Sequence, residues 1–389
     1  MSIHLFSVAL AAMSLLLGAQ PESIGRLDGT TITKEEAASF ARETLAGLHV
    51  TGAQLAVLDR GKLVWCQAFG LRSRNPDQPM ECDTNIWAAS ITKSVFATYA
   101  MQLVERGRFS LDIPVAKQLP QPLDTYEPYR ESASELVRDP AWPTVTPRML
   151  LAHASGLLNF ATIEPDKKMH LHFKPGSQFS YSGEGINLVQ FLIEQQQKRP
   201  LTDLLQDAIF GPLGMQNTGL IYRQEFSKNV ADRFDAEERF HAQTKRFPAH
   251  AAGSMSTCAN DLAIFVSALF AGKILNPAAQ KEMLRPFMQI RTLHQFPIKA
   301  NEPPGEQARS VGLAYGVGWG LLTHTRFGPA FFKEGHGDGA QNYLICFERR
   351  KACMILLTNS ENGEHAFKTL LEKIFGDTVT PWEWEGYLQ

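Results

Sequence analysis

The stretch IWAASITKSVFATYAMQLVERG, Ile86 to Gly107, carries a serine and a lysine three residues apart at the predicted start of a helix. This spacing places Ser90 and Lys93 on one helical face. A lysine desolvated at a buried helix start can have a pKa low enough to take a serine proton, and the helix N-terminus supplies N–H groups where an oxyanion would form. The stretch therefore indicates a nucleophile and its base. The alternative is a capping serine followed by an exposed lysine, because the S-x-x-K spacing alone is a weak signal.

Composition sets the class of protein. The chain has 389 residues, ordinary apolar and charged fractions and a formal net charge of −2. It can bury a large core as one big domain or two interlocked ones. Acidic and basic residues are scattered evenly without a basic stripe, so we expect no nucleic-acid partner.

The N-terminus resembles an export signal. An apolar run from Leu5 to Ala19 is closed by small residues and is short for a membrane span. We therefore predict a signal peptide over residues 1–20, a periplasmic or secreted protein, and no stable membrane span after signal removal. No Lys or Arg precedes the run, so a misplaced start and a loose N-terminal anchor are the alternatives.

Five cysteines are too few and too scattered for a disulfide framework, and at least one thiol must stay unpaired. Cys346 and Cys353 stand symmetrically about Arg349 and Arg350, so a hairpin turning there would place them opposite each other. A disulfide is one interpretation. Small buried hydrophobes are the favoured one, because direct cross-strand bridges are geometrically demanding.

Strand patterns lie at both ends of the chain. QLAVL and KLVWCQAFG flank the turn-like Asp59-Arg60-Gly61, and NYLICF and ACMILLTN form a second predicted hairpin. A capping box of Thr33 and Glu36 opens a helix near the N-terminus, and an amphipathic helix is predicted over 364–375.

The middle of the chain is helical in its periodicity. We expect an α+β fold in which residues 21–83 and 314–389 form an antiparallel sheet with its own helices, packed against a mainly helical part over 84–313. A cleft between the two parts is the natural place for a site.

Several further sequence blocks follow the serine and the lysine in a defined order. TPRMLLAHASGL (146–157), KPGSQFSYSGEGINLVQFLIE (174–194) and EGHGDGAQNY (334–343) follow the ASITKS block. In this order the chain resembles the β-lactamase-related serine hydrolases, which include class C β-lactamases, D-alanyl-D-alanine carboxypeptidases and esterase relatives. The resemblance covers most of the chain. It implies a β-lactamase/transpeptidase-like fold, an acyl-enzyme mechanism on a small ester, amide or peptide, and no metal or other cofactor.

The resemblance also implies residue roles. Ser90 would be the acylated nucleophile and Lys93 its proton partner. Tyr181 would be a second acid/base group, with Lys93 close by to favour the phenolate or to pass protons through it. His336 would begin a third motif and meet the polar end of the substrate.

The rest of the third motif is His336-Gly337-Asp338-Gly339. Gly337 follows the histidine in this predicted substrate-binding strand, and the backbone N–H of Gly339 would be a second oxyanion donor. Asp338 stands where a glycine is expected, so either the strand shifts its register or Asp338 enters the site and disfavours carboxylate-bearing substrates.

The second motif departs from the family at Gly183, where an asparagine usually follows Tyr-x. Losing that amide argues against efficient β-lactam hydrolysis. We therefore expect an exported serine hydrolase with esterase or D-amino-acid peptidase/carboxypeptidase activity. The alternatives are a true β-lactamase or penicillin-binding protein, and a non-catalytic binding protein on the same scaffold. The oligomeric state is left open.

Three further features have two interpretations each. The segment from Gln118 to Pro143 could roof the cleft or be a surface excursion. His170 and His172 lie near two acidic residues and could suggest a metal, but solvent-exposed polar residues are favoured. His153 is predicted to hold a loop by hydrogen bonding rather than to act in catalysis.

Overall fold

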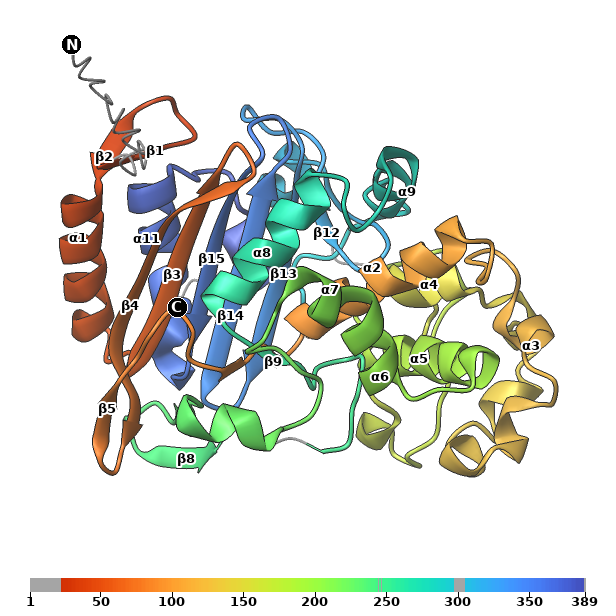
Figure 1. The fold of residues 1–389 in the computed structure, drawn as a ribbon. Helices are drawn as coiled ribbons and strands as arrows, with labels where there is room; N and C mark the ends of the chain where they lie inside the picture. Colours follow the sequence, from red (N-terminus) through yellow and green to blue (C-terminus); the bar gives the residue numbers. More distant parts are fainter. Residues whose placement is uncertain (1–21, 244, 246, 297–304, 388–389) are drawn as a thin grey trace, which may run out of the picture.

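The computed structural model describes residues 22–243, 245, 247–296 and 305–387, and the predicted signal peptide lies outside them. Its centre is a nine-stranded antiparallel sheet to which both ends of the chain contribute (Figure 1). In spatial order the strands are β10 (Met288–Gln289), β11 (Leu313–Tyr315), β12 (Gly320–Leu322), β13 (Ala330–Gly337), β14 (Ala340–Phe347), β15 (Ala352–Thr358), β3 (Gly52–Asp59), β4 (Lys62–Arg74) and β5 (Asp77–Pro79). The predicted α+β fold with a sheet built from both chain ends is confirmed.

Helices cover both faces of the sheet, so β14 and β15 are buried along their whole length. On one face lie α1 (Lys34–Gly47), α11 (Phe367–Leu370) and α12 (Trp382–Glu385), which share an apolar core with β3. Helix α1 begins at the predicted capping box of Thr33 and Glu36. The other face carries α8 (Ala259–Phe270), seen across the strands in Figure 1.

The helical part lies beside the sheet and surrounds α2 (Ile91–Glu105), whose residues from Ile91 to Leu103 are all buried. A helix that is buried on every side lies inside a core. Its other helices in the described part of the chain are α3 (Val115–Gln118), α4 (Pro147–Leu151), α5 (Gly183–Gln197), α6 (Leu201–Leu205), α7 (Gly211–Leu213) and α9 (Pro277–Met283). Helix α10 (Glu306–Ser310) instead packs beside β11, and its Ala308 belongs to the core of the face that carries α1.

The described residues also form three two-stranded sheets: β1 (Ser23–Gly25) with β2 (Thr31–Thr33), β6 (Ile86–Trp87) with β9 (Ser256–Thr257), and β7 (Asp232–Phe234) with β8 (Phe240–Gln243). The division predicted from sequence differs from the structure at β10, which lies within residues 84–313 but belongs to the large sheet, and at α8. This helix falls within residues 84–313 but packs on the sheet, because its apolar face continues the core that α2 shares with β14 and β15.

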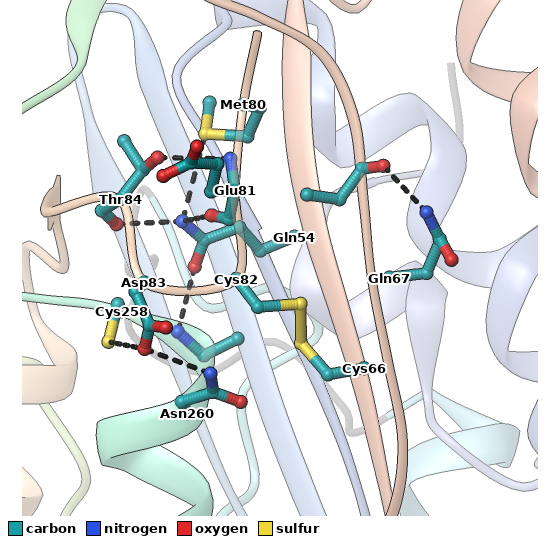
Figure 2. Close-up of a disulfide and its surroundings, with 12 residues drawn as sticks. Gln54, Cys66, Gln67, Met80, Glu81, Cys82, Asp83, Thr84, Cys258 and Asn260 are labelled. Atoms are coloured by element: carbon teal, nitrogen blue, oxygen red, sulfur yellow. Dashed lines mark hydrogen bonds between the residues drawn. A yellow bond between two sulfur atoms is a disulfide. The ribbon is translucent and has the colours of Figure 1, made fainter. Parts of the chain in front are cut away.

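Two disulfides correct the interpretation of the cysteines. Cys66 on β4 is bonded to Cys82 in the segment that leads into the helical part (Figure 2). Cys346 and Cys353 are bonded across β14 and β15, where the register places them directly opposite with Cα atoms 4.1 Å apart. The predicted hairpin was right, but reading this pair as separate buried hydrophobes was wrong, because cross-strand neighbours this close can bond. Cys258 is the buried free thiol.

The segment from Gln118 to Pro143 packs on the helical part as a series of 3-10 turns. Tyr126 and Tyr129 each set their rings edge-on to Phe191 of α5, with centroids 5.1 Å apart. Among the described residues, no helix is long and apolar enough to cross a bilayer.

Candidate active site

Ser90 lies at the start of α2, where the chain leaves β6 through Ala89 in the left-handed region at φ 44°. Lys93, one turn into the helix, donates from Nζ to Ser90 Oγ at 2.8 Å and to the carbonyl oxygen of Ala252 at 2.5 Å. The lysine is only 2% exposed. Burial, helped by the positive charge of Lys333, lowers the pKa of Lys93 well below its usual value, and Glu334 opposes this. A neutral amine there can accept the serine proton.

Tyr181 reaches the same place from the residue before the N-cap of α5. Its ring stacks on His153, with centroids 4.2 Å apart, and Lys93 Nζ lies 4.9 Å from its centroid. Burial raises the pKa of the phenol well above its usual value, the charge of Glu334 adds to this, and a hydrogen bond with Ser90 opposes it. Of the two roles predicted for Tyr181, passing protons as a neutral phenol suits this environment better than a phenolate.

His153 confirms its predicted role. It is fully buried, and its Nδ1 accepts the backbone N–H of Ser182 at 3.1 Å. Burial and the two nearby lysines, Lys333 and Lys93, lower the pKa of its imidazole well below the usual value. A neutral His153 therefore packs against the ring of Tyr181 and holds it in place.

Lys333 and Glu334 on β13 belong to the site and were missed from sequence. Lys333 Nζ donates to Tyr181 Oη at 3.0 Å and forms a fully buried ion pair with Glu334. Burial lowers the pKa of Lys333, and attraction to Glu334 opposes this. The sequence did contain a signal for this pair. Burying a lysine and a glutamate inside the apolar strand AFFKEG is unfavourable unless the two side chains are paired.

Gly335 follows this pair where β13 passes the start of α2. A Cβ atom on Gly335 would collide with the carbonyl oxygen of Ala88, so only glycine permits this approach. A cationic residue followed two positions later by a glycine, the pattern expected at His336 and position 338, is therefore met by Lys333 and Gly335. The third motif lies three residues earlier than the sequence predicted, and Lys333 takes the place expected for His336.

His336 lines the cavity beside Ser90, with Nε2 3.0 Å from Glu364 Oε2. The other predicted residues of the motif do not line this cavity. Gly337 lies against the ring of Trp87, which leaves no room for a side chain. The side chain of Asp338 is 87% exposed in the turn after β13, so it does not enter the site.

Gly339 is not placed as an oxyanion donor. Its backbone N–H donates to Glu361 Oε2 at 2.5 Å, and its φ of +71° belongs to the turn between β13 and β14. The prediction failed because the strand register had been anchored on His336 instead of Lys333.

Gly183, the departure in the second motif, also presents no group to the cavity. Its N–H donates to Asn159 Oδ1 at 2.9 Å. A Cβ atom here would lie 2.7 Å from the ring of Phe160, so this ring occupies the space that a side chain at position 183 would need.

The site opens into a cavity of about 430 Å³ between the two parts of the fold. Its lining residues are Trp87, Ala89, Ser90, Lys93, Asn159, Phe160, Tyr181, Asn187, His250, Ala252, Gly253, Ser254 and His336. None of these is acidic and none lies between Gln118 and Pro143, so the structure gives that segment no part in roofing the cavity. A larger hollow of about 630 Å³ near α9 contains none of the predicted catalytic residues.

The histidines considered for a metal each contact a carboxylate instead. His170 Nε2 lies 2.9 Å from Asp166 Oδ2, and His172 Nε2 lies 2.6 Å from Glu164 Oε1. Within the described part of the chain, no group of three or more His, Cys, Asp or Glu side chains could hold a metal ion.

The fold and the site together define a class of protein. Its members have an antiparallel sheet beside a helical part, and a Ser-x-x-Lys helix start, a tyrosine and a strand lysine meet between these two parts. The family model described as Beta-lactamase matches residues 37–375. The chain belongs to this family.

Comparisons with individual proteins agree. The chain is 27% identical to Esterase EstB of Burkholderia gladioli over 227 residues, half of this chain and 55% of EstB, so it spans little more than half the length of that relative. The octameric penicillin-binding protein homologue of Pyrococcus abyssi has a TM-score of 0.69 at 23% identity, covering 88% of this chain and 79% of that one. D-amino acid amidase of Ochrobactrum anthropi SV3 has a TM-score of 0.64 at 23% identity, covering 90% and 95%. The two solved structures establish the fold.

Proposed function

We propose that this protein is a serine hydrolase that forms an acyl-enzyme on Ser90. The observation that carries the proposal is the 2.8 Å hydrogen bond between Ser90 Oγ and the amine of a lysine that is 2% exposed. Serine is a poor nucleophile until a neighbouring base takes its proton, and a desolvated lysine is such a base. The esterase and amidase named among the similar proteins support hydrolysis as the reaction class.

In acylation, Ser90 Oγ attacks the substrate carbonyl while its proton passes to Lys93. The N–H of Ser90 at the start of α2 is one donor for the oxyanion. We assign the second to His336. Gly337 and Ala340 flank the hairpin turn, so the N–H of Gly337 points towards β14. N–H directions alternate along an antiparallel strand, so the N–H of His336 points the other way, to the open edge of β13. This is the edge where Gly335 approaches Ala88.

The leaving group then needs a proton. Lys93, now an ammonium, returns it through the hydroxyl of Tyr181, which is neutral before and after the step. Lys333 donates to Tyr181 Oη and thereby leaves the phenol proton free to point at the leaving oxygen. The same groups work in reverse when water attacks the acyl-enzyme.

The groups around the cavity favour a substrate without a carboxylate. Lys333 is paired with Glu334, and the lining residues that the structure describes include no arginine, so they offer little to a substrate carboxylate. Gly183 supplies no amide for a β-lactam side chain. An ester, or an amide such as that of a D-amino acid, therefore fits better than a β-lactam or a peptide with a free carboxyl end.

Export to the periplasm or medium is part of the proposal. The two disulfides are typical of proteins from oxidising compartments and support it, together with the apolar run near the N-terminus. Fractionation of cells expressing the full chain, with mass measurement of the N-terminus, tests it. A full-length protein that remains in the cytoplasm would contradict it.

Labelling with a fluorophosphonate probe tests the nucleophile. Intact mass and peptide mapping should place one adduct on Ser90, and the Ser90→Ala variant should show none. Hydrolysis of p-nitrophenyl butyrate should fall by at least about 10³-fold in that variant. A folded protein that neither reacts with the probe nor turns over any ester or amide would favour the binding-protein alternative.

A further inference from the structure

Another cavity of about 430 Å³, the α2-end cavity, lies at the opposite end of α2 from Ser90. Asp207 is the one acidic residue among the described residues that line it, and its Oδ2 lies 2.7 Å from Nη2 of Arg199. Four basic side chains line the same cavity: Arg106, Arg108, Arg199 and Lys273.

Most of these basic groups have no acidic partner. Arg108 donates to the side-chain oxygen of Gln197 at 2.5 Å. Within the described part of the chain, Arg106, Arg108 and Lys273 form no ion pair with a carboxylate. The cavity therefore carries more positive charge than the side chains around it neutralise.

Helix ends account for part of this charge. The helices α2, α5 and α8 end beside the cavity, and each is followed within three residues by one of its basic residues. A helix C-terminus carries about half a negative charge, so the three ends and Asp207 together offset about 2.5 of the four positive charges. About 1.5 positive charges are left for a ligand.

Tyr99 adds a hydrogen-bonding group to this cavity from α2. The residue is 3% exposed, yet its hydroxyl has no hydrogen-bond partner among the described residues. Burial raises the pKa of the phenol, and the charges of Arg108, Arg106 and Arg199 oppose this, so the three guanidinium groups lie within electrostatic reach of the hydroxyl. An acceptor that suits both the hydroxyl and these cations is an oxyanion.

We propose that the α2-end cavity binds the phosphate group of a small organic phosphate ester. A phosphate monoester carries about 1.5 to 2 negative charges at pH 7 and three acceptor oxygens, which match the remaining charge and the cluster of donors. A carboxylate offers less charge and two oxygens. The organic part would contact the apolar lining residues, which are Leu103, Leu204, Ala208, Pro212 and Ile274.

This site does not depend on the proposed reaction at Ser90. At a rise of about 1.5 Å per residue, Arg106 lies about 24 Å along the helix from the serine. The Ser90→Ala variant should therefore bind the phosphate ester as tightly as wild-type protein does.

Isothermal titration calorimetry with phenyl phosphate at low ionic strength tests the proposal. One molecule should bind per chain, added salt should weaken the binding, and phenol should not bind measurably. Arg106→Gln and Arg108→Gln change exposed residues and should each weaken binding by about tenfold or more. Tyr99→Phe removes only the hydroxyl and should weaken binding by about fivefold.

Arg42→Gln removes an exposed arginine from α1 and is the matched control, which should bind as wild type does. Lys273→Gln, also at an exposed position, serves if an arginine variant of the cavity does not fold. Equal affinity for phenyl phosphate in the control and in the folded cavity variants would overturn the proposal, because binding would then not depend on this cavity.

A soluble ester and a lipid headgroup can both present this phosphate. Flotation with phosphatidylcholine vesicles that contain phosphatidic acid distinguishes the two sources. Retention on vesicles that Arg106→Gln loses and Arg42→Gln keeps would support the site and identify a headgroup, whereas binding of phenyl phosphate without retention would support it and identify a soluble ester. Wild-type protein that binds neither probe would overturn the proposal and leave the proposed function standing.

Discussion

Lys333 Nζ lies 3.0 Å from Tyr181 Oη, although the two residues are 152 positions apart in the chain. The contact joins the sheet to the helical part directly behind Ser90. It places two lysines around one phenol, since Lys93 Nζ lies 4.9 Å and Lys333 Nζ 4.8 Å from the centroid of the Tyr181 ring. Glu334 neutralises Lys333, so Lys93 is the group in this cluster best placed to give up its proton.

The first prediction concerns pH. Burial and the charge of Lys333 lower the pKa of Lys93, and the unprotonated amine is the active base. Activity should therefore rise with pH along a limb whose midpoint lies well below the ordinary lysine value of about 10.4. A pH profile of kcat/KM, with an ester that does not ionise, measures it.

Lys333→Met sharpens this test. It removes the charge that lowers the pKa of Lys93 and leaves Glu334, which raises it, so the limb should move to higher pH. Lys333→Arg keeps the charge and should move the limb less. A limb at the wild-type position in folded Lys333→Met would contradict this electrostatic role.

The second prediction concerns stability. The pKa of Lys93 is lower in the folded protein than in the unfolded chain, so between the two pKa values the unfolded chain binds more protons. The free energy of unfolding then rises with pH across that window, and the lysine destabilises the fold below it by about 1.4 kcal/mol for each pKa unit of difference. Lys93→Met should abolish activity and raise Tm by a few degrees at pH 7.

This gain should shrink as the pH approaches about 10.4, where the wild-type amine is neutral in both states. The lost hydrogen bond to the Ala252 carbonyl opposes the gain and sets its size. Exposed Lys281→Met is the control and should show no such pH dependence. The contrary result would be a Lys93→Met protein that is less stable than wild type by the same amount at pH 7 and at pH 10. It would show that packing, not desolvation of the amine, dominates the stability at this position.

The sequence predicted the parts of the fold that local patterns specify. The Thr33–Glu36 capping box, the hairpin of β3 and β4 and that of β14 and β15 all depend on residues close together in the chain. The S-x-x-K spacing likewise placed Ser90 and Lys93 together, because one helical turn brings them within reach.

The sequence could not predict features that depend on contacts between distant segments. The register of β13 against α2 is decided by the fit of Gly335 under Ala88, so anchoring the motif on His336 displaced it and hid Lys333. Asn159 enters the cavity from a loop whose path depends on its bond to Gly183. The Cys66–Cys82 disulfide joins a strand to a later loop, and no local spacing of residues predicted it.

The third prediction concerns Gly183. Restoring the asparagine of the usual motif with Gly183→Asn should push the ring of Phe160 out of its place and lower kcat/KM for esters by about tenfold. Combining it with Phe160→Ala should recover part of the loss, because the smaller side chain frees the space. Phe160→Ala alone is the control. Wild-type rates in Gly183→Asn would mean that the ring moves aside without cost.

The fourth prediction concerns Gly335, where β13 passes the start of α2. A methyl group in Gly335→Ala would collide with the Ala88 carbonyl and must push β13 away from Ser90. Because small displacements of catalytic groups are costly, kcat should fall by about 10²-fold or more, while the melting temperature falls only modestly. Gly47→Ala in α1 adds the same methyl group where nothing lies within 4 Å and should leave kcat unchanged. Equal kcat in the two folded variants would show that the strand can shift without disturbing the nucleophile, and would remove the support that this approach gives to an oxyanion donor on β13.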